Sequence, residues 1–326
     1  MSIISSMYVL IYIPAYNEAA KIGEVIRSLP DSLPNVEQVG KLVVDDGSTD
    51  GTAKIAEDAG AGVVRHEMNR GVGGAFHTAL ESALKLGADI LVSIDADGQF
   101  DPAEIEKLIA PIMEGRADLV TGNRFASGQK PGNMPKVRYW GNLAMSRIVS
   151  TLSPGRRIQD VSCGFRAYSR EALLNLNLYG RFTYTQETVM DIAFKGLPIV
   201  EIPIVVRYFT GRKSRVARNL PRYGINTMNI ILRTFRDYKP MLFFGTMGLA
   251  VMTVGLLMSG FLAVHYLKTG MTSPYKMLGI AGGILVLAGL LIVGYSLLAD
   301  MLDRIRTTQE KLLYYEKKKL FNRTEY

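Results

Sequence analysis

Two long stretches without a charged residue constrain the fold of this chain more than any other feature. They cover residues 242–264 and 277–299, and each is 23 residues long. A helix of that length extends about 35 Å, enough to cross a hydrocarbon core of ~30 Å. Because so long an apolar helix is unusual inside a soluble domain, we expect two membrane-spanning helices. They also account for a hydrophobic content of 48% in a chain of 326 residues.

The positive charge of the chain is concentrated beside these two stretches. Residues 207–239 contain nine Lys or Arg residues and one acid, Asp237, and seven Lys or Arg residues follow the second stretch, against five acids. The connection at residues 265–276 has only Lys268 and Lys276. The positive-inside rule therefore predicts an integral membrane protein with both termini in the cytoplasm. Basic segments beside a membrane attract anionic lipids, which argues against nucleic acid as the partner.

Residues 8–206 alternate between strand-like and helix-like segments. The apolar run at residues 7–13 lacks the basic segment of a signal peptide and is expected to form the first strand. The expected strands cover residues 8–13, 41–45, 62–65, 90–94, 118–121 and 199–206, and the expected helices cover residues 19–28, 52–59, 73–86 and 102–114. This alternation predicts an α/β domain with a mostly parallel sheet, in which ligands bind at the carboxyl ends of the strands. The single cysteine, Cys163, excludes an intrachain disulfide.

Two carboxylates and an amide follow the strand expected at residues 90–94. Asp95, Asp97 and Gln99 alternate along the sequence, so an extended chain would place them on one side. Hard oxygen ligands of this kind suit Mg²⁺ or Mn²⁺, which in turn hold phosphates. Taken alone, the pattern fits equally well a strand end whose acids are only solvated.

Polar residues also follow the first two expected strands. The first strand leads into Pro14-Ala-Tyr-Asn-Glu18, and the second into Val44-Asp-Asp-Gly-Ser48. Because the carboxyl ends of parallel strands share one edge of a sheet, three strands would bring acids or polar aromatics to the same place. Such an edge repels itself unless it binds cations or accepts hydrogen bonds from a ligand. The structural alternative for the second motif is a tight turn followed by a capped helix.

The later half of the domain supplies cations and one more acid. They are Arg124 after the fifth strand, Lys136, Arg138 and Tyr139 in a segment rich in Gly and Pro that is expected to be a loop, Asp160 four residues before Gly164, and Arg207, Arg212, Lys213 and Arg215 after the last strand. Taken singly, each is more often a solvated surface charge. The glycine-rich segment at residues 69–74 suits phosphate binding or a plain turn, and no Gly-Lys-Ser/Thr follows it, so it is not a P-loop.

Together these residues resemble a family 2 glycosyltransferase of the GT-A fold. More narrowly, they are similar to the polyprenyl-phosphate hexose synthases, the group of dolichyl-phosphate mannose synthase and the bacterial bactoprenol glucosyltransferases. The resemblance covers about residues 7–215 and rests on Pro14-Ala-Tyr-Asn-Glu18, Val44-Asp-Asp-Gly-Ser48, Asp95-Ala-Asp-Gly-Gln99, Gly122-Asn-Arg124, Asp160-x-x-x-Gly-Phe-Arg166, and Arg207 with Lys213 six residues later. The trailing pair of spans matches a recurring form of that group.

The resemblance implies a role for each matching residue. The residues around the nucleotide would be Pro14, Tyr16, Glu18, Val44 and Asp46. Asp95 and Ala96 would face the ribose and phosphate. Asp97 and Gln99 would hold the metal, with Asp95 beside them. Donor phosphates would be neutralised by Arg124, Arg207 and Lys213, the acceptor phosphate would meet Arg138, and the base or orienting group would be Asp160. Val72 stands where many relatives carry Lys, and Asn142 stands where some relatives carry Ser. These two departures leave the identity of the substrate open.

The function implied is inverting, metal-dependent transfer of a hexose from a UDP- or GDP-linked sugar to dolichyl or undecaprenyl phosphate. The expected organisation is a cytoplasmic transferase domain at residues 1–216, a basic amphipathic segment at 217–241, spans at 242–264 and 277–299, and a basic tail at 300–326. Apolar residues and arginines recur with helical spacing over residues 220–238, which predicts a helix in the membrane interface or, alternatively, an ordinary packing helix. Gly279-x-x-x-Gly283 could pack the spans within one chain or between copies of a homo-oligomer.

Three other functions fit this sequence less well. A processive polysaccharide synthase of the same superfamily typically carries Gln-x-x-Arg-Trp, whereas the only tryptophan here, Trp140, follows Arg138-Tyr without that Gln. A nucleotidyltransferase would have no reason for lipid-facing segments. A non-catalytic membrane scaffold would have no need of the intact acidic residues. The base and the sugar of the donor stay open, because specificity lies in the shape of the pocket.

Overall fold

The computed structural model describes residues 7–128, 131–132, 134–153, 157–178, 184–207 and 220–321. Contacts within the chain divide it into two compact units. The first unit extends to Ile231 and also includes the chain from Leu313 onward, and the second covers Leu232–Leu312.

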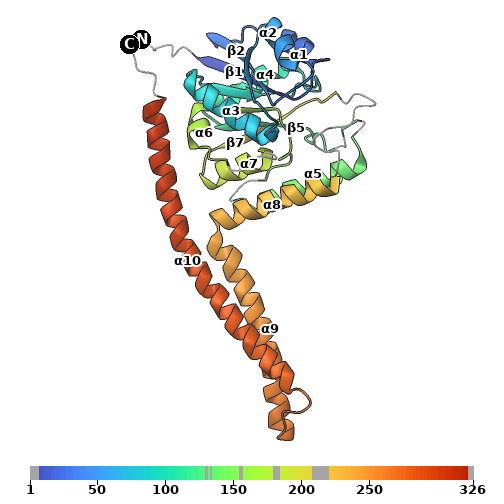
Figure 1. Cartoon of the computed structure of the whole chain (residues 1–326), viewed down its shortest axis with the longest axis vertical. Helices are drawn as coiled ribbons and strands as arrows, with labels where there is room; N and C mark the ends of the chain where they lie inside the picture. Colours follow the sequence, from blue (N-terminus) through green and yellow to red (C-terminus); the bar gives the residue numbers. More distant parts are fainter. Residues whose placement is uncertain are drawn as a thin grey trace. The chain divides into compact units, whose positions relative to one another are not determined.

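The first unit is built around a seven-stranded sheet with the order β3-β2-β1-β4-β6-β5-β7, of which Figure 1 labels β1, β2, β5 and β7. The strands are β1 (Tyr8–Ala15), β2 (Gln38–Asp45), β3 (Gly62–Arg65), β4 (Ile90–Ser93), β5 (Leu119–Asn123), β6 (Arg166–Ser169) and β7 (Ile199–Pro203). β6 is antiparallel to both β4 and β5, and the other pairs among the described strands are parallel. The predicted α/β fold with a mostly parallel sheet is therefore confirmed.

Helices of the first unit alternate with these strands. They are α1 (Ile22–Ser28), α2 (Thr52–Asp58), α3 (Gly71–Lys85), a short 3₁₀ turn at Pro102–Glu104, α4 (Ile105–Met113), α5 (Lys136–Leu152), α6 (Arg170–Asn175) and α7 (Thr185–Phe194). The turn before α4 has a clear start signal, because Asp101 accepts a hydrogen bond from the backbone N–H of Ala103 at 3.0 Å and Pro102 follows it.

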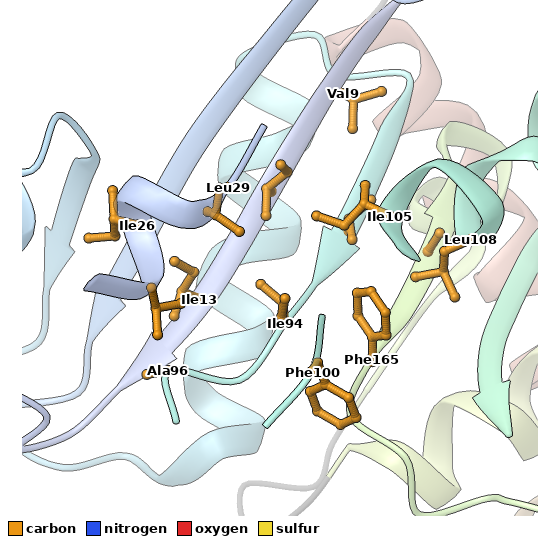
Figure 2. Packing of buried hydrophobic residues seen from close by; sticks show 14 of the residues in the cluster. Val9, Ile13, Ile26, Leu29, Ile94, Ala96, Phe100, Ile105, Leu108 and Phe165 are labelled. Atoms are coloured by element: carbon orange, nitrogen blue, oxygen red, sulfur yellow. The ribbon is translucent and has the colours of Figure 1, made fainter. Parts of the chain in front are cut away.

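The main hydrophobic core lies between β1, β4, α1 and α4. Figure 2 shows Val9 and Ile13 of β1 pointing toward side chains of α1 and α4. β1 is a continuous apolar run from Val9 to Ile13 with almost no exposed surface, which is typical of a strand covered on both faces. Each such side chain contributes about 1.5–3 kcal/mol when it is fully buried. This core fixes the ends of β1 and β4, from which the polar motifs emerge.

Two local predictions were wrong. Lys136 and Arg138 lie in the first turn of α5 and not in a loop. The Gly- and Pro-rich segment ends at Pro135, and the helix begins at the next residue. Asp95 to Gln99 are not extended, because β4 ends at Ser93 and a turn follows. That turn is closed by the backbone N–H of Gln99, which donates to Oδ1 of Asp97 at 3.0 Å.

The second unit contains the two predicted spans as helices α9 (Pro240–Thr269) and α10 (Lys276–Leu320). By length and composition, both helices are long and apolar enough to cross a membrane. They pack along a seam of small residues: a Cβ atom added to Gly248 would lie 2.9 Å from the carbonyl oxygen of Gly289, and one added to Gly255 would lie 2.7 Å from that of Gly282. Such close approach of backbones is how apolar helices associate where burial from water no longer drives contact.

The predicted Gly279-x-x-x-Gly283 motif is only half used in this seam. Gly279 faces Leu262 of α9, whereas nothing lies within 4 Å of a Cβ atom added to Gly283. The seam instead repeats at seven-residue spacing, with Gly282 and Gly289 on α10. Association between copies of the chain stays a prediction.

α8 (Leu220–Tyr238) has the bounds of the helix expected beside the spans. Thr227 and Ile231 are fully buried, whereas Ile225 and Leu232 on another side of the helix are exposed. α8 thus has both a buried stripe and an exposed stripe with apolar residues. This pattern is compatible with a helix in the membrane interface and with an ordinary packing helix.

The end of α10 belongs to the first unit and is held at α6. Nζ of Lys317 donates to the carbonyl oxygen of Leu176 at 2.9 Å and to Oδ1 of Asn177 at 3.0 Å, and the Tyr314 hydroxyl donates to Glu171 at 3.1 Å. Lys317 therefore satisfies acceptors just beyond the C-terminal end of α6. The tail predicted at residues 300–326 is helical as far as Leu320.

Candidate functional site

The carboxyl ends of β1, β2 and β4 lie side by side in the sheet. Ala15 pairs with Asp45, and Tyr12 pairs with Ser93. The segments that follow these strands therefore start at one edge, as the sequence predicted. These segments carry the predicted nucleotide and metal residues Tyr16, Glu18, Asp46, Asp95, Ala96, Asp97 and Gln99. Pro14 and Val44 lie within the last residues of β1 and β2 themselves.

The segments after β1 and β2 are bound to each other by short hydrogen bonds. The backbone N–H of Asn17 donates to the Ser48 hydroxyl at 2.8 Å, and the side-chain oxygen of Asn17 accepts from the N–H of Thr49 at 2.9 Å. The N–H of Glu18 donates to the Thr52 hydroxyl at 2.9 Å. These bonds hold the exposed ring of Tyr16 on a preorganised loop.

Asp46 is the anchor of the glycine-rich loop. Its carboxylate is buried and accepts from the backbone N–H groups of Arg70 and Gly71, both at 2.8 Å, and it lies 2.7 Å from Nδ1 of His66. An ionised carboxylate only accepts, so Nδ1 of His66 carries the hydrogen. The other ring nitrogen lies 2.9 Å from the Thr78 hydroxyl on α3. Sequence reasoning placed Asp46 at the nucleotide and missed His66, the residue that orients it.

Gly47, in the segment after β2, allows that segment to lie close to the residues that begin the glycine-rich loop. Its φ angle is +79°, and a Cβ atom added there would lie 2.9 Å from backbone atoms of Met68 and Asn69. Both the left-handed backbone and the lack of space call for glycine.

We therefore expect Gly47→Ala to destabilise the first unit by about 2 kcal/mol or more, from backbone strain plus the displaced loop. Gly51→Ala is the matched control: its φ angle is also positive, at +83°, but nothing lies within 4 Å of the added methyl group. The control should lose only about 1 kcal/mol. Thermal unfolding followed by the fluorescence of Trp140 compares the two variants, and equal losses would contradict the close approach.

Asp95 and Asp97 sit half-buried in the turn after β4. Asp95 lies against Gly164: a Cβ atom added to Gly164 would be 3.1 Å from Oδ1 of Asp95. This proximity gives a physical reason for the glycine four residues after Asp160, because any side chain there would press on the Asp95 carboxylate.

Arg207 is held beside this acidic turn although it lies more than 100 residues away in sequence. Its backbone N–H donates to the carbonyl oxygen of Gln99 at 2.9 Å, and Phe100 and Val206 form a β-bridge. The exposed guanidinium reaches Asp101 at 3.2 Å. The structure thus brings an exposed cationic side chain beside the acidic turn, and its binding of phosphate stays a prediction. Lys213, the second predicted cation, lies outside the described residues.

Asp160 and Arg124, which the sequence placed in separate roles, form one buried ion pair. The carboxylate has no exposed surface and accepts from Nε of Arg124 at 2.7 Å and from Nη2 at 2.8 Å. It also accepts from the backbone N–H of Arg124 at 3.1 Å. Glu201 on β7 holds the segment in place by accepting from the N–H of Asp160 at 2.9 Å, and burial raises the pKa of Glu201.

Arg138 is linked to this pair through α5. The ring of Phe125, next to Arg124 in sequence, lies 5.6 Å from that of Tyr139, next to Arg138. Further along the helix, the Ser146 hydroxyl accepts from the N–H of Val161 at 3.3 Å. The helix that carries Arg138 is therefore docked on the segment that carries Asp160.

The sequence did not reveal that Arg166, a buried arginine near the site, has a structural role. Arg166 on β6 has no exposed surface and donates to the carbonyl oxygens of Thr185 and Val161, at 2.7 and 2.9 Å. It ties the start of α7 to the segment after Asp160. Beside it, burial raises the pKa of the Cys163 thiol to about 12, so this thiol is not a nucleophile near neutral pH.

The described residues offer few protein ligands for a metal ion. No group of three or more His, Cys, Asp or Glu side chains surrounds one point in the part of the chain that the structure describes. Two half-buried carboxylates and the Gln99 amide are nevertheless hard oxygen donors on one turn, a set that fits Mg²⁺ or Mn²⁺ when phosphate oxygens and water complete the shell.

Comparison with known proteins defines the class of this chain. Residues 10–176, just over half of the chain, match the model of the glycosyl transferase family 2. This chain is a family 2 glycosyltransferase. A crystal structure of glucosyl-3-phosphoglycerate synthase from Mycobacterium tuberculosis with Mn²⁺, UDP-glucose and phosphoglyceric acid superposes with a TM-score of 0.54 at 26% identity, covering 72% of this chain and 80% of that one. The glycosyltransferase therefore has the GT-A fold of such enzymes.

Two relatives of this glycosyltransferase carry informative names. A UDP-N-acetylglucosamine–dolichyl-phosphate N-acetylglucosaminyltransferase of Methanococcus voltae is 37% identical over 221 residues, which are 61% of this chain and 86% of the relative. A polyprenol monophosphomannose synthase of Mycolicibacterium smegmatis is 32% identical over 222 residues, which are 64% of this chain and 80% of the relative. Both relatives are named for acceptors of the polyprenol type and differ in the sugar.

Proposed function

We propose that this glycosyltransferase transfers a hexose or N-acetylhexosamine from a nucleotide-sugar to a membrane polyprenyl phosphate. The observation that carries the proposal is the acidic turn Asp95–Gln99 with Arg207 bonded to it, in a chain that also has two helices able to span a membrane. The names of the two relatives support the acceptor class. Because those names differ in the sugar, the donor stays open between UDP- and GDP-linked sugars.

The donor would bind along the shared edge of β1, β2 and β4. Tyr16 is exposed on its preorganised loop and would stack on the base, with Pro14, Glu18 and Val44 around it. Asp46 would contribute through the glycine-rich loop that it anchors, and Asp95 and Ala96 would face ribose and phosphate. The diphosphate would then lie over the turn at Asp97, between carboxylates and cations.

A divalent metal held by Asp97, Gln99 and Asp95 would neutralise the charge that develops on the leaving nucleoside diphosphate. Mn²⁺ in the crystallised structural neighbour supports a divalent metal without deciding between Mg²⁺ and Mn²⁺. Arg207 and, by sequence, Lys213 would add cationic side chains on the open side of the diphosphate. The guanidinium of Arg124 would act from its buried position beside Asp160.

The acceptor needs little activation. A phosphate monoester has a second pKa of ~6 and is mostly dianionic near neutral pH, so it is already nucleophilic. Arg138 would hold it, and one in-line attack would invert the anomeric carbon. Asp160 accepts two hydrogen bonds from the guanidinium of Arg124 in a fully buried position, which suits a carboxylate that orients cations around the acceptor better than one that exchanges protons with it.

The membrane would hold the lipid acceptor next to the site. The basic residues on both sides of the spans favour an arrangement with the transferase unit and both termini in the cytoplasm. Labelling of single cysteines placed at Lys54 and at Lys268, with a reagent that does not cross membranes, distinguishes the two sides. Labelling of the Lys54 position in sealed right-side-out vesicles would contradict this orientation.

A donor screen tests the proposed function. Purified protein in vesicles is given UDP-glucose, UDP-N-acetylglucosamine and GDP-mannose in turn, with and without polyprenyl phosphate and with Mg²⁺, Mn²⁺ or chelator. We expect one donor to release nucleoside diphosphate in a manner that requires both metal and lipid. Release that ignores the lipid, or no release with any donor, would reject the proposal.

A further inference from the structure

Arg207 is fixed at its backbone and exposed at its guanidinium. Its N–H donates to the carbonyl oxygen of Gln99 at 2.9 Å, and the preceding residue, Val206, forms a β-bridge with Phe100. Phe100 is itself held in the core, where its ring stacks on that of Phe165 with the centroids 5.1 Å apart. The backbone of Arg207 therefore keeps a fixed place beside the acidic turn, and only the side chain has room to change direction.

Asp101 uses its two carboxylate oxygens for two separate contacts. Oδ1 accepts a hydrogen bond from the N–H of Ala103 at 3.0 Å and so caps the helical turn that precedes α4. Oδ2 accepts from Nη2 of Arg207 at 3.2 Å. Because the cap holds one oxygen in place, the other oxygen is presented to the arginine in a set direction.

The contact between Asp101 and Arg207 is weak enough to be exchanged for another. One N–H reaches one oxygen, and the two side chains are 37% and 70% exposed. Exposed ion pairs of this kind contribute little, whereas a guanidinium binds phosphate oxygens through two parallel charge-assisted hydrogen bonds. A diphosphate at the acidic turn would therefore take the guanidinium from Asp101.

The attachment point of Arg207 allows this exchange. Its backbone is bonded to Gln99, which lies midway in the sequence between Asp97 and Asp101. A long side chain that starts there can turn toward Asp101 or toward a ligand bound at Asp97. In the structure it turns toward Asp101.

We propose that Asp101 is a positioning residue, which holds the guanidinium of Arg207 beside the acidic turn until a metal-bound diphosphate displaces it. This role rests on the proposed function, because the diphosphate is that of the donor. Asp101 thus competes with the donor for Arg207, and binding of the donor breaks the ion pair.

Asp101→Asn tests the competition, because it removes the charge and keeps the cap: Asn serves as well as Asp at that position. The full chain in detergent micelles is titrated by calorimetry with Mn²⁺ and UDP, GDP or inorganic pyrophosphate, and the compound that binds most tightly becomes the probe. We expect Asp101→Asn to bind the probe about threefold more tightly than the wild type, since binding no longer breaks an exposed ion pair. Weaker or unchanged binding, or no binding of any of the three compounds by the wild type, would overturn the proposal.

A double-variant cycle separates loss of the ion pair from loss of a negative charge near an anion. Arg207→Gln alone should weaken binding of the probe by about tenfold or more, because a charged hydrogen-bond donor is lost. In that background, the gain from Asp101→Asn should be smaller than in the wild type by at least about twofold. Glu106→Gln, at an exposed acid on α4, is the control for charge and should change the affinity less than about twofold. Equal gains from Asp101→Asn in both backgrounds would show that Asp101 does not act through Arg207.

Asp101→Ala distinguishes positioning of Arg207 from a purely structural role. This variant loses the cap as well as the charge, so its unfolding temperature should fall, whereas that of Asp101→Asn should stay close to the wild-type value. Both variants should nevertheless gain affinity for the probe. An affinity that follows the unfolding temperature instead of the charge would assign Asp101 to the cap alone. The titrations contain no sugar and no lipid, so a failure to transfer sugar to lipid would reject the proposed function and leave this test intact.

Discussion

Asp97→Ala is expected to abolish sugar transfer while the protein stays folded and membrane-bound. The carboxylate sits half-buried in the turn that follows β4, and its loss would remove a ligand from the proposed metal, which would stabilise the leaving diphosphate. Removing one preorganised group that stabilises developing charge typically costs about 10²–10³-fold in rate, and a metal ligand should cost at least that. Release of nucleoside diphosphate from the preferred donor is the measurement.

Asp58→Ala is the matched control for this variant. Asp58 is an exposed carboxylate on α2 whose partner is Lys54 at 2.7 Å. Its loss should leave both the rate and the unfolding temperature nearly unchanged, because exposed ion pairs contribute little. If Asp97→Ala kept more than a tenth of the wild-type rate, as the control does, the assignment of the metal to this turn would be wrong.

The ion pair between Arg124 and Asp160 should behave as one unit when it is mutated. Both side chains are almost completely buried, so removing one partner leaves the other as an uncompensated charge. Arg124→Met and Asp160→Asn should each destabilise the first unit by about 3–5 kcal/mol. The double variant should be less destabilised than the sum of the two, by about 2 kcal/mol or more, because it buries no lone charge. Thermal unfolding followed by Trp140 fluorescence measures the cycle.

The pair formed by Lys54 and Asp58 provides the comparison for this cycle. Its atoms are separated by the same 2.7 Å, but both side chains are exposed. The same cycle there should give a coupling of about 0.5 kcal/mol or less. Additive effects at Arg124 and Asp160 would mean that the two side chains do not depend on each other, which would contradict the buried pair.

The sequence could predict which polar residues come together in the site, because most of them directly follow the ends of strands. β1, β2 and β4 have apolar patterns that end abruptly in polar residues, and parallel pairing puts those ends together. The nearness of Arg207 to Gln99 was expected only through resemblance to known enzymes, because no local pattern links residues so far apart. The turn at residues 96–98 had a local signal in its Asp-Gly pair, which favours a turn over an extended chain.

The contacts that the sequence did not predict depend on which strands pair and on the register of that pairing. His66 meets Asp46 because Asp45 pairs with Arg65 across β2 and β3, and nothing within residues 62–70 reveals that pairing. The bond between Arg124 and Asp160 likewise requires β5 to lie beside β6. Helix α5 was hidden by the glycines and prolines that precede it.

Transfer of radiolabelled sugar from the preferred nucleotide-sugar into lipid tests the central claim most directly. Vesicles that contain the protein, polyprenyl phosphate and divalent metal are extracted with organic solvent, and the extract is analysed before and after mild acid. We predict one labelled lipid that carries a single sugar, whose formation stops with chelator and with Asp97→Ala. Label found only in free sugar or in a water-soluble polymer, with none in lipid, would contradict the account.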